Sequence, residues 1–99
     1  MINLTFSTKD HKISGFKCEG HAGYAAAGQD IVCSAVSSCL IGAVEEVRRY
    51  SPAKYVVSPG LIDLEVKPTK ATQILMEFAL HTMQSVEEQY PDYIKITIE

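Results

Sequence analysis

The sequence predicts a single α+β domain in which two helices pack on a mixed or antiparallel β-sheet. Several short stretches alternate apolar and polar residues, as half-buried strands do, and two longer stretches repeat apolar residues at helical spacing. The resulting order is β-β-α-β-β-α-β, in which hairpins favour antiparallel pairs and helices provide the crossovers. A chain of 99 residues can bury one core, so we expect one domain over residues 1–99.

The first two strands are predicted to form a hairpin. Apolar and polar residues alternate over residues 1–6, and Asp10-His11 follows as a turn. Residues 13–19 then form the returning strand, with Phe16 and Cys18 on one face. Gly15 interrupts the alternation, which favours a β-bulge at that point.

Two helices are predicted, over residues 30–50 and about 70–90. Asp30 is a suitable N-cap for the first, and Ser51-Pro52 ends it because the residue before proline avoids the α region. Pro91 ends the second helix. Its apolar stripe is expected to face the core and consists of Leu75, Phe78, Ala79, Met83 and Val86.

Three further strands complete the predicted sheet. Residues 55–57 form a short strand, and Ser58-Pro59-Gly60 is a turn. Residues 62–66 alternate between apolar and charged side chains. The last strand, residues 93–99, has isoleucine at every second position.

Composition and charge exclude several classes of function. The net charge is −3 and the nine Lys and Arg residues are scattered, so no basic stripe for direct nucleic-acid binding is present. Arg48-Arg49 lie where a helix should end, and the helix dipole accounts for them. No apolar run is long enough for a membrane span. Three cysteines without a secretory signal indicate a reducing cytoplasm rather than a disulfide framework.

The most informative feature is His21 and Cys33, twelve residues apart. His21 closes a strand-like run in Gly20-His21-Ala22-Gly23, and Cys33 lies at the third position of the predicted first helix. A helix N-terminus favours the thiolate form of cysteine, which is the reactive form. A nucleophilic Cys33 with His21 as its base is therefore the leading interpretation.

Three neighbours of Cys33 are candidate supporting residues. The backbone N–H groups of Cys33 or Ser34 are expected to receive the oxyanion of a tetrahedral intermediate. Asp30 either caps the helix or orients the histidine, and the sequence leaves both roles open. Ser37 lies one turn beyond Cys33 on the same face, so its hydroxyl can approach the sulfur or the imidazole.

A loop over residues 22–29 joins the two motifs. Gly20, Gly23 and Gly28 give it backbone freedom at both ends, and Tyr24 is its large side chain. Two interpretations stay open: a mobile flap that contacts substrate through Gly23, Tyr24 and Gly28, or a plain connection.

Metal binding is the rival interpretation, because Cys18, His21, Cys33 and Cys39 are all metal-ligand types. Cys33 and Cys39 are six residues apart on one helix, which is about 600° of rotation, or about 240° beyond a full turn. They point to different sides, and the spacings match no structural zinc pattern. We therefore expect no metal and no cofactor, and read Cys18 and Cys39 as core residues.

The chain resembles the Prp (YsxB) family of bacterial ribosomal-processing cysteine proteases. The resemblance is carried by Gly20-His21-Ala22, by the interval to Asp30-Ile31-Val32-Cys33, and by Ser37 four residues later. A second matching stretch is Val86-Glu87-Glu88-Gln89-Tyr90-Pro91. Chain length and element order are also similar, while Ser34 replaces the alanine of the family pattern.

The resemblance implies a specific activity. Family members remove an N-terminal extension from the large-subunit ribosomal protein numbered twenty-seven, after an apolar, aromatic-rich sequence. His21 would be the base and Cys33 the nucleophile, supported by Asp30 and Ser37. The resemblance also implies a homodimer with a flexible loop over the site.

One alternative of a different class remains at this point. The same loop would serve a non-enzymatic, ribosome-associated module that binds a peptide without cutting it. Such a module has no need of a reactive thiol, so labelling with iodoacetamide at neutral pH distinguishes the two.

Overall fold

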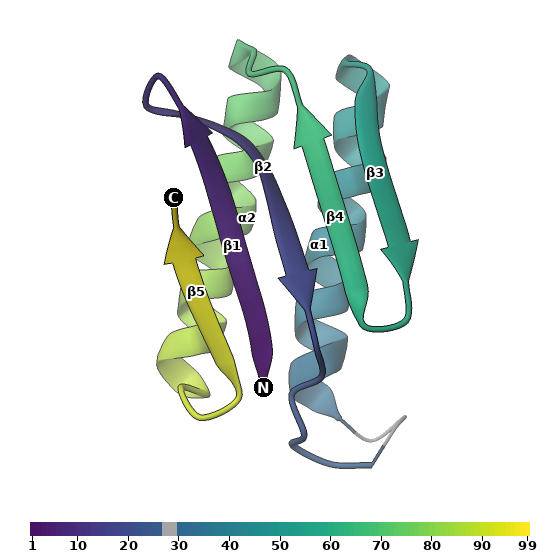
Figure 1. The fold of residues 1–99 in the computed structure, drawn as a ribbon, viewed down its shortest axis with the longest axis vertical. Helices are drawn as coiled ribbons and strands as arrows, with labels where there is room; N and C mark the ends of the chain where they lie inside the picture. Colours follow the sequence, from purple (N-terminus) through teal and green to yellow (C-terminus); the bar gives the residue numbers. More distant parts are fainter. Residues whose placement is uncertain (27–29) are drawn as a thin grey trace.

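The computed structural model describes residues 1–26 and 30–99, and its elements follow the predicted order. The elements are β1 (Ile2–Lys9), β2 (Lys12–Glu19), α1 (Ile31–Tyr50), β3 (Ala53–Ser58), β4 (Leu61–Val66), α2 (Lys70–Gln89) and β5 (Ile94–Ile98). The strands form one sheet in the order β3-β4-β2-β1-β5, and both helices cover the same face of it (Figure 1). β1 runs parallel to β5 and the other neighbours are antiparallel, so the prediction of a mixed sheet is confirmed.

The first hairpin has the predicted turn, and its β-bulge lies at Ser14, one residue before the predicted position. Asp10 and His11 both adopt positive φ, 53° and 65°, which suits a tight hairpin turn. Ser7 pairs with Gly15 and Thr8 pairs with Ile13. Ser14 therefore has no partner on β1 and forms the bulge. A side chain at position 15 would overlap the carbonyl oxygen of Leu64 on β4, so only glycine allows this close pairing.

The core lies between the sheet and the two helices. Alternate residues of β1, β2 and β4 point toward the helices, and Phe6 and Phe16 pack with ring centroids 5.6 Å apart. Helix α1 contributes one buried stripe, which consists of Val32, Val36, Leu40, Val44 and Val47. The spacing of three and four residues in this stripe is why α1 lies flat on the sheet.

The predicted inner stripe of α2 is wrong in one position. Phe78 is 69% exposed, and the buried stripe of the helix is Thr72, Met76, Ala79 and Met83. Apolar residues surround more of this helix than its sheet-facing side needs. The ring of Phe78 therefore lies at the mouth of a groove between α1 and α2, beside Gly42 and Cys39.

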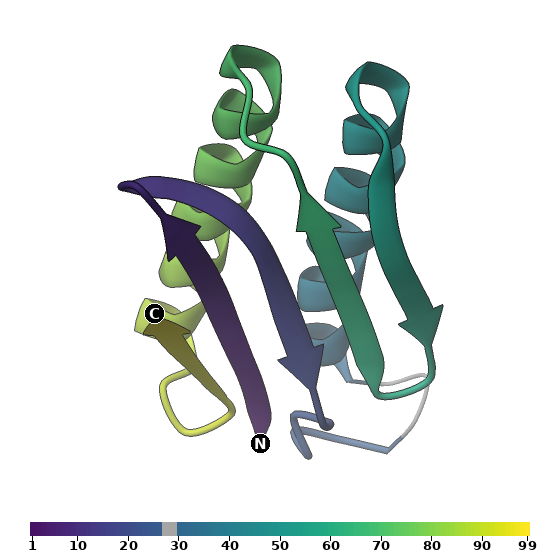
Figure 2. The ribbon, with the colours of Figure 1, turned by 45° about the horizontal axis from the view of Figure 1, so that its top comes forward.

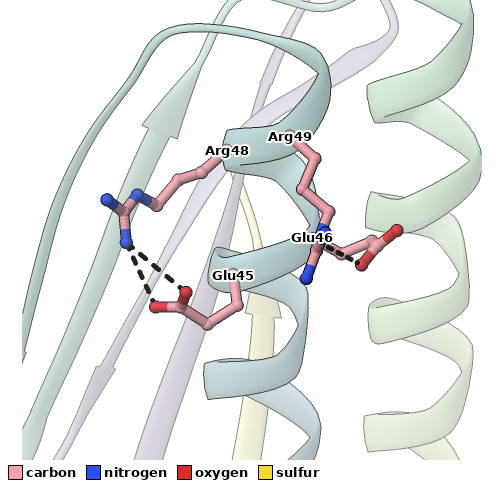
Figure 3. A network of polar contacts seen from close by, with 4 residues as sticks. All are labelled: Glu45, Glu46, Arg48 and Arg49. Atoms are coloured by element: carbon pink, nitrogen blue, oxygen red, sulfur yellow. Dashed lines mark hydrogen bonds and ion pairs between the residues drawn. The ribbon is translucent and has the colours of Figure 1, made fainter.

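The C-terminal end of α1 carries only local ion pairs. Arg48 contacts Glu45 at 3.2 Å and Arg49 contacts Glu46 at 3.3 Å, all with substantially exposed side chains (Figure 3). The guanidinium of Arg48 also lies 4.4 Å from the ring centroid of Tyr55 on β3. Exposed pairs of this kind contribute at most about 1 kcal/mol each.

The fold gathers four segments at one end of the sheet. The end of β2, the start of α1, the β3–β4 turn and the α2–β5 connection all lie at the lower end in Figures 1 and 2. His21, Cys33, Gly60 and Tyr90 belong to these segments. Neither described helix is long and apolar enough to cross a membrane.

Candidate active site

Asp30 organises the start of α1. Its Oδ1 accepts hydrogen bonds from the backbone N–H groups of Val32 (3.0 Å) and Cys33 (2.9 Å). Its Oδ2 accepts from the N–H of Tyr24 at 3.1 Å. One buried carboxylate therefore caps the helix and ties the preceding segment to it, as an aspartate N-cap is expected to do.

These bonds also hold Asp30 in its charged form. The N–H of Cys33, followed by that of Tyr24, lowers the pKa of the Asp30 carboxyl below its usual value, although desolvation acts in the opposite direction. Both carboxylate oxygens are occupied by backbone donors. Of the two roles that the sequence left open, the geometry favours the helix cap over the orienter of His21.

The sulfur of Cys33 receives a backbone hydrogen bond from the segment that carries His21. The N–H of Ala22 donates to Cys33 Sγ at 3.2 Å. This N–H belongs to the peptide unit that joins His21 to Ala22, and Ala22 itself is buried. The Gly20-His21-Ala22 motif thus lies directly against the Cys33 thiol, although His21 and Cys33 are twelve residues apart in the sequence.

This geometry corrects the predicted oxyanion donors. The N–H of Cys33 is used by the Asp30 carboxylate, and the N–H of Ser34 donates to the Asp30 carbonyl oxygen at 3.1 Å. An aspartate cap satisfies the donors that a helix N-terminus otherwise leaves free. The N–H of Ala22 is instead the donor directed at Cys33 Sγ, and a donor in that position can serve an oxyanion that forms beside the sulfur.

Cys33 and His21 line the same cavity, whose volume is about 470 Å³. The imidazole lies against the β3–β4 turn, because a Cβ on Gly60 would be only 3.1 Å from His21 Nε2. Gly60 also accepts a hydrogen bond from Gly20 N–H at 3.0 Å, which joins this turn to the end of β2. The rest of the lining is largely apolar and includes Ile2, Val36, Ile41, Val57, Leu61 and Ile62.

The other predicted site residues divide into two groups. Ser37 lines the cavity together with Cys33 and His21, as its position one turn along α1 predicts. Ser34 is exposed, and neither it nor Gly23 or Tyr24 belongs to the lining within the described part of the chain. Gly28, the third predicted loop residue, lies outside the described residues.

Sequence reasoning missed Gly60 and the apolar residues of β3 and β4 as site residues. The Ser58-Pro59-Gly60 turn was recognised only as a turn. The glycine at position 60 was the available signal. In the structure it adopts φ of +74°, and its lack of a side chain leaves room for the imidazole of His21. Nothing local indicates that this turn lies beside a histidine some forty residues earlier.

Cys18 is a second thiol in the cavity lining. Its side chain is buried, and burial together with the charges of Cys33 and Glu19 raises the pKa of Cys18 to about 11. A thiol that keeps its proton is a poor nucleophile, so Cys18 is not a candidate nucleophile at neutral pH.

The raised pKa of Cys18 predicts a loss of stability in alkali. The folded protein keeps a proton that the unfolded chain releases above the ordinary value of 9.0, so stability falls as pH rises toward about 11. Between these pH values the wild type should lose up to about 2 kcal/mol more unfolding free energy than Cys18→Ala. Urea unfolding of both proteins across this range measures the difference, and parallel pH curves would contradict it.

Within residues 1–26 and 30–99, no group of three or more His, Cys, Asp or Glu side chains is arranged to hold a metal ion. All three cysteines are free. Cys33 and Cys39 line different cavities, as their separation along the helix predicts.

The chain is similar to known proteases along nearly its whole length. A family model described as "Cysteine protease Prp" matches residues 1–95. The chain is 32% identical to the "Ribosomal processing cysteine protease Prp" of Mycoplasma pneumoniae, over 95% of this chain and 91% of the relative. It is 29% identical to the Bacillus subtilis protein of the same name, over 98% and 96% of the two chains.

A solved structure has the same fold. It is an essential ribosomal processing protease Prp from S. aureus, in complex with a covalently linked product peptide. It superposes with a TM-score of 0.93 over the full length of both chains, at 23% identity.

Proposed function

The chain belongs to the cysteine protease Prp family, and from that premise we propose that it removes the N-terminal extension of a bacterial large-subunit ribosomal protein, the one numbered twenty-seven. The relatives from B. subtilis and M. pneumoniae are named as ribosomal processing proteases, which supports a ribosomal precursor as substrate. We further propose that Cys33 and His21 form the catalytic dyad.

One observation carries the dyad proposal. The peptide unit that joins His21 to Ala22 donates its N–H to Cys33 Sγ at 3.2 Å, while both side chains line one cavity. No other pair of thiol and imidazole in the described residues shares this arrangement with a helix N-terminus. Membership of a protease family also favours an enzyme over the non-enzymatic binding module.

In the proposed reaction His21 takes the proton of the Cys33 thiol as the sulfur attacks the scissile carbonyl carbon. The carbonyl oxygen becomes an oxyanion beside the sulfur, where the N–H of Ala22 can stabilise it. The imidazolium then gives its proton to the leaving amine, and the S–C bond holds an acyl-enzyme. Water, deprotonated by His21, breaks that bond and releases the new carboxylate and the free thiol.

The lining of the cavity supports an apolar extension as the substrate. Ile2, Val36, Ile41, Val57 and Leu61 offer aliphatic surface beside the reacting groups. A cavity of about 470 Å³ is large enough for an aliphatic or aromatic side chain but not for a folded protein. Affinity would then come from an extended segment whose apolar side chains enter this cavity.

Cleavage assays test the proposal. The purified protein and its Cys33→Ala variant are incubated separately with the extension peptide and with casein, and the products are read by mass spectrometry. We expect one cut in the peptide, no cut by the variant and little cleavage of casein. Casein fragments at a comparable rate would indicate a general protease, and binding of an uncut peptide would favour the binding module.

We also propose that the protein acts in the cytoplasm, where a ribosomal precursor is made. We further propose that it forms a homodimer. A candidate surface for the homodimer is the α1–α2 groove, whose lining includes Leu75 and the 69% exposed Phe78. Contiguous apolar surface of this kind is typical of interaction sites. Sedimentation that finds only monomers would contradict this part.

A further inference from the structure

Tyr24, in the segment between β2 and α1, packs on two tyrosines from the far end of the chain. Its ring centroid lies 5.1 Å from that of Tyr93 and 5.7 Å from that of Tyr90. The interplanar angles are 74° and 87°, so both contacts are edge-to-face, an orientation that aromatic quadrupoles favour. These three residues are called the tyrosine cluster below.

The two C-terminal tyrosines form a fixed platform for Tyr24. The N–H of Tyr90 donates to the Val86 carbonyl at 2.9 Å, and the N–H of Tyr93 donates to the Tyr90 carbonyl at 3.0 Å. The Tyr93 carbonyl in turn accepts from Ile2 N–H at 2.9 Å, at the start of β1. Both rings are partly buried against the core, whereas Tyr24 is 41% exposed.

The segment that Tyr24 anchors carries the contacts of the site. The N–H of Tyr24 donates to Asp30 Oδ2, and the other oxygen of that carboxylate holds the N–H of Cys33. Two residues before Tyr24, the N–H of Ala22 donates to Cys33 Sγ. Any displacement of Tyr24 therefore acts on both the cap and the donor at the sulfur.

We infer that the tyrosine cluster positions the reacting groups, by holding residues 22–26 so that the Ala22 N–H stays directed at Cys33. Tyr24, Tyr90 and Tyr93 are positioning residues in this inference, which rests on the proposed function for its effect on rate. The inference gives the Tyr90-Pro91 stretch a role in the reaction, although this stretch lies at the other end of the chain from His21. Tyr90 is the C-cap of α2, and Pro91 directly after it prevents the helix from continuing.

The test compares Tyr93→Ala with Tyr93→Phe, which keeps the ring. Tyr50→Ala is the matched control, because Tyr50 is 61% exposed at the opposite end of α1. Amide hydrogen exchange is followed by NMR, and kcat and KM are measured with the extension peptide. Tyr24→Ala is a second variant whose exposed side chain makes misfolding less of a concern.

The inference predicts a local effect. Exchange at the Ala22 amide should rise about tenfold in both Tyr93→Ala and Tyr24→Ala, and exchange at the Tyr24 amide should rise about tenfold in Tyr93→Ala. Core amides such as those of Phe6 and Leu64 should keep their wild-type rates. The value of kcat should fall by a similar factor with KM little changed. Tyr93→Phe and Tyr50→Ala should match the wild type in both measurements.

Two outcomes would overturn the inference. Unchanged exchange at Ala22 and Tyr24 would show that the cluster does not hold the segment. An equal rise at every amide would show a loss of global stability alone. If the wild type fails to cut the extension peptide, the proposed function fails, but the exchange measurement still decides whether the cluster holds the segment.

Discussion

Cys33→Ala should abolish cleavage of the extension peptide, with a loss of at least about 10³-fold in kcat. The side chain supplies the attacking sulfur, and the variant leaves the methyl group of alanine in its place. The fold should persist, because Cys33 is only partly buried and its backbone N–H keeps its bond to Asp30. Circular dichroism and thermal unfolding verify that the variant is folded.

Cys39, which lines a different cavity, is the matched control for this variant, and Cys18 is a second comparison from within the same cavity lining. Cys18→Ala and Cys39→Ala should both keep activity, since burial raises the pKa of each thiol and disfavours the nucleophilic form. Cys18 is buried in the core, so its truncation should lower stability by about 1 kcal/mol. Cleavage of the extension peptide by Cys33→Ala would contradict the assignment of Cys33 as the nucleophile.

His21→Ala should lower kcat by roughly 10²–10⁴-fold, the range expected for loss of a general base. The imidazole is exposed on the cavity side and packs on Gly60, so its removal should leave the core intact. His11→Ala and His81→Ala are matched controls, because both side chains are exposed and distant from the cavity lining in the described structure. A loss of activity as large in either control would remove His21 from its proposed role.

The Asp30→Asn variant tests how much Asp30 contributes to kcat compared with His21. The amide oxygen of asparagine can still accept from Val32 and Cys33, so the helix cap is kept. Its NH₂ group would face the N–H of Tyr24, where a second donor replaces an acceptor. We therefore expect a smaller loss of kcat than in His21→Ala, and an equal loss would make Asp30 a third catalytic residue.

The amino-acid order alone was sufficient to predict the order of helices and strands, and it singled out His21 and Cys33 as the candidate reacting pair. Strand alternation, the Asp30 cap and the breaks at Pro52 and Pro91 act over a few neighbouring residues, so they can be read locally. His21 and Cys33 were predicted for the same reason, because each lies at the end of a predicted element. The structure brings both into one cavity, and their catalytic roles remain predictions.

The contacts that complete the site depend on segments that are distant in the chain, and only the packed molecule reveals them. The donor at the sulfur is the N–H of Ala22 rather than that of Cys33 or Ser34, because the side chain of Asp30 and its carbonyl use the latter two. Gly60 meets His21, and Tyr93 meets Tyr24, at one end of a sheet whose strand order does not follow the sequence. Local periodicity carries no information about which turn or ring lies opposite, since that is set by the packing of the helices on the sheet.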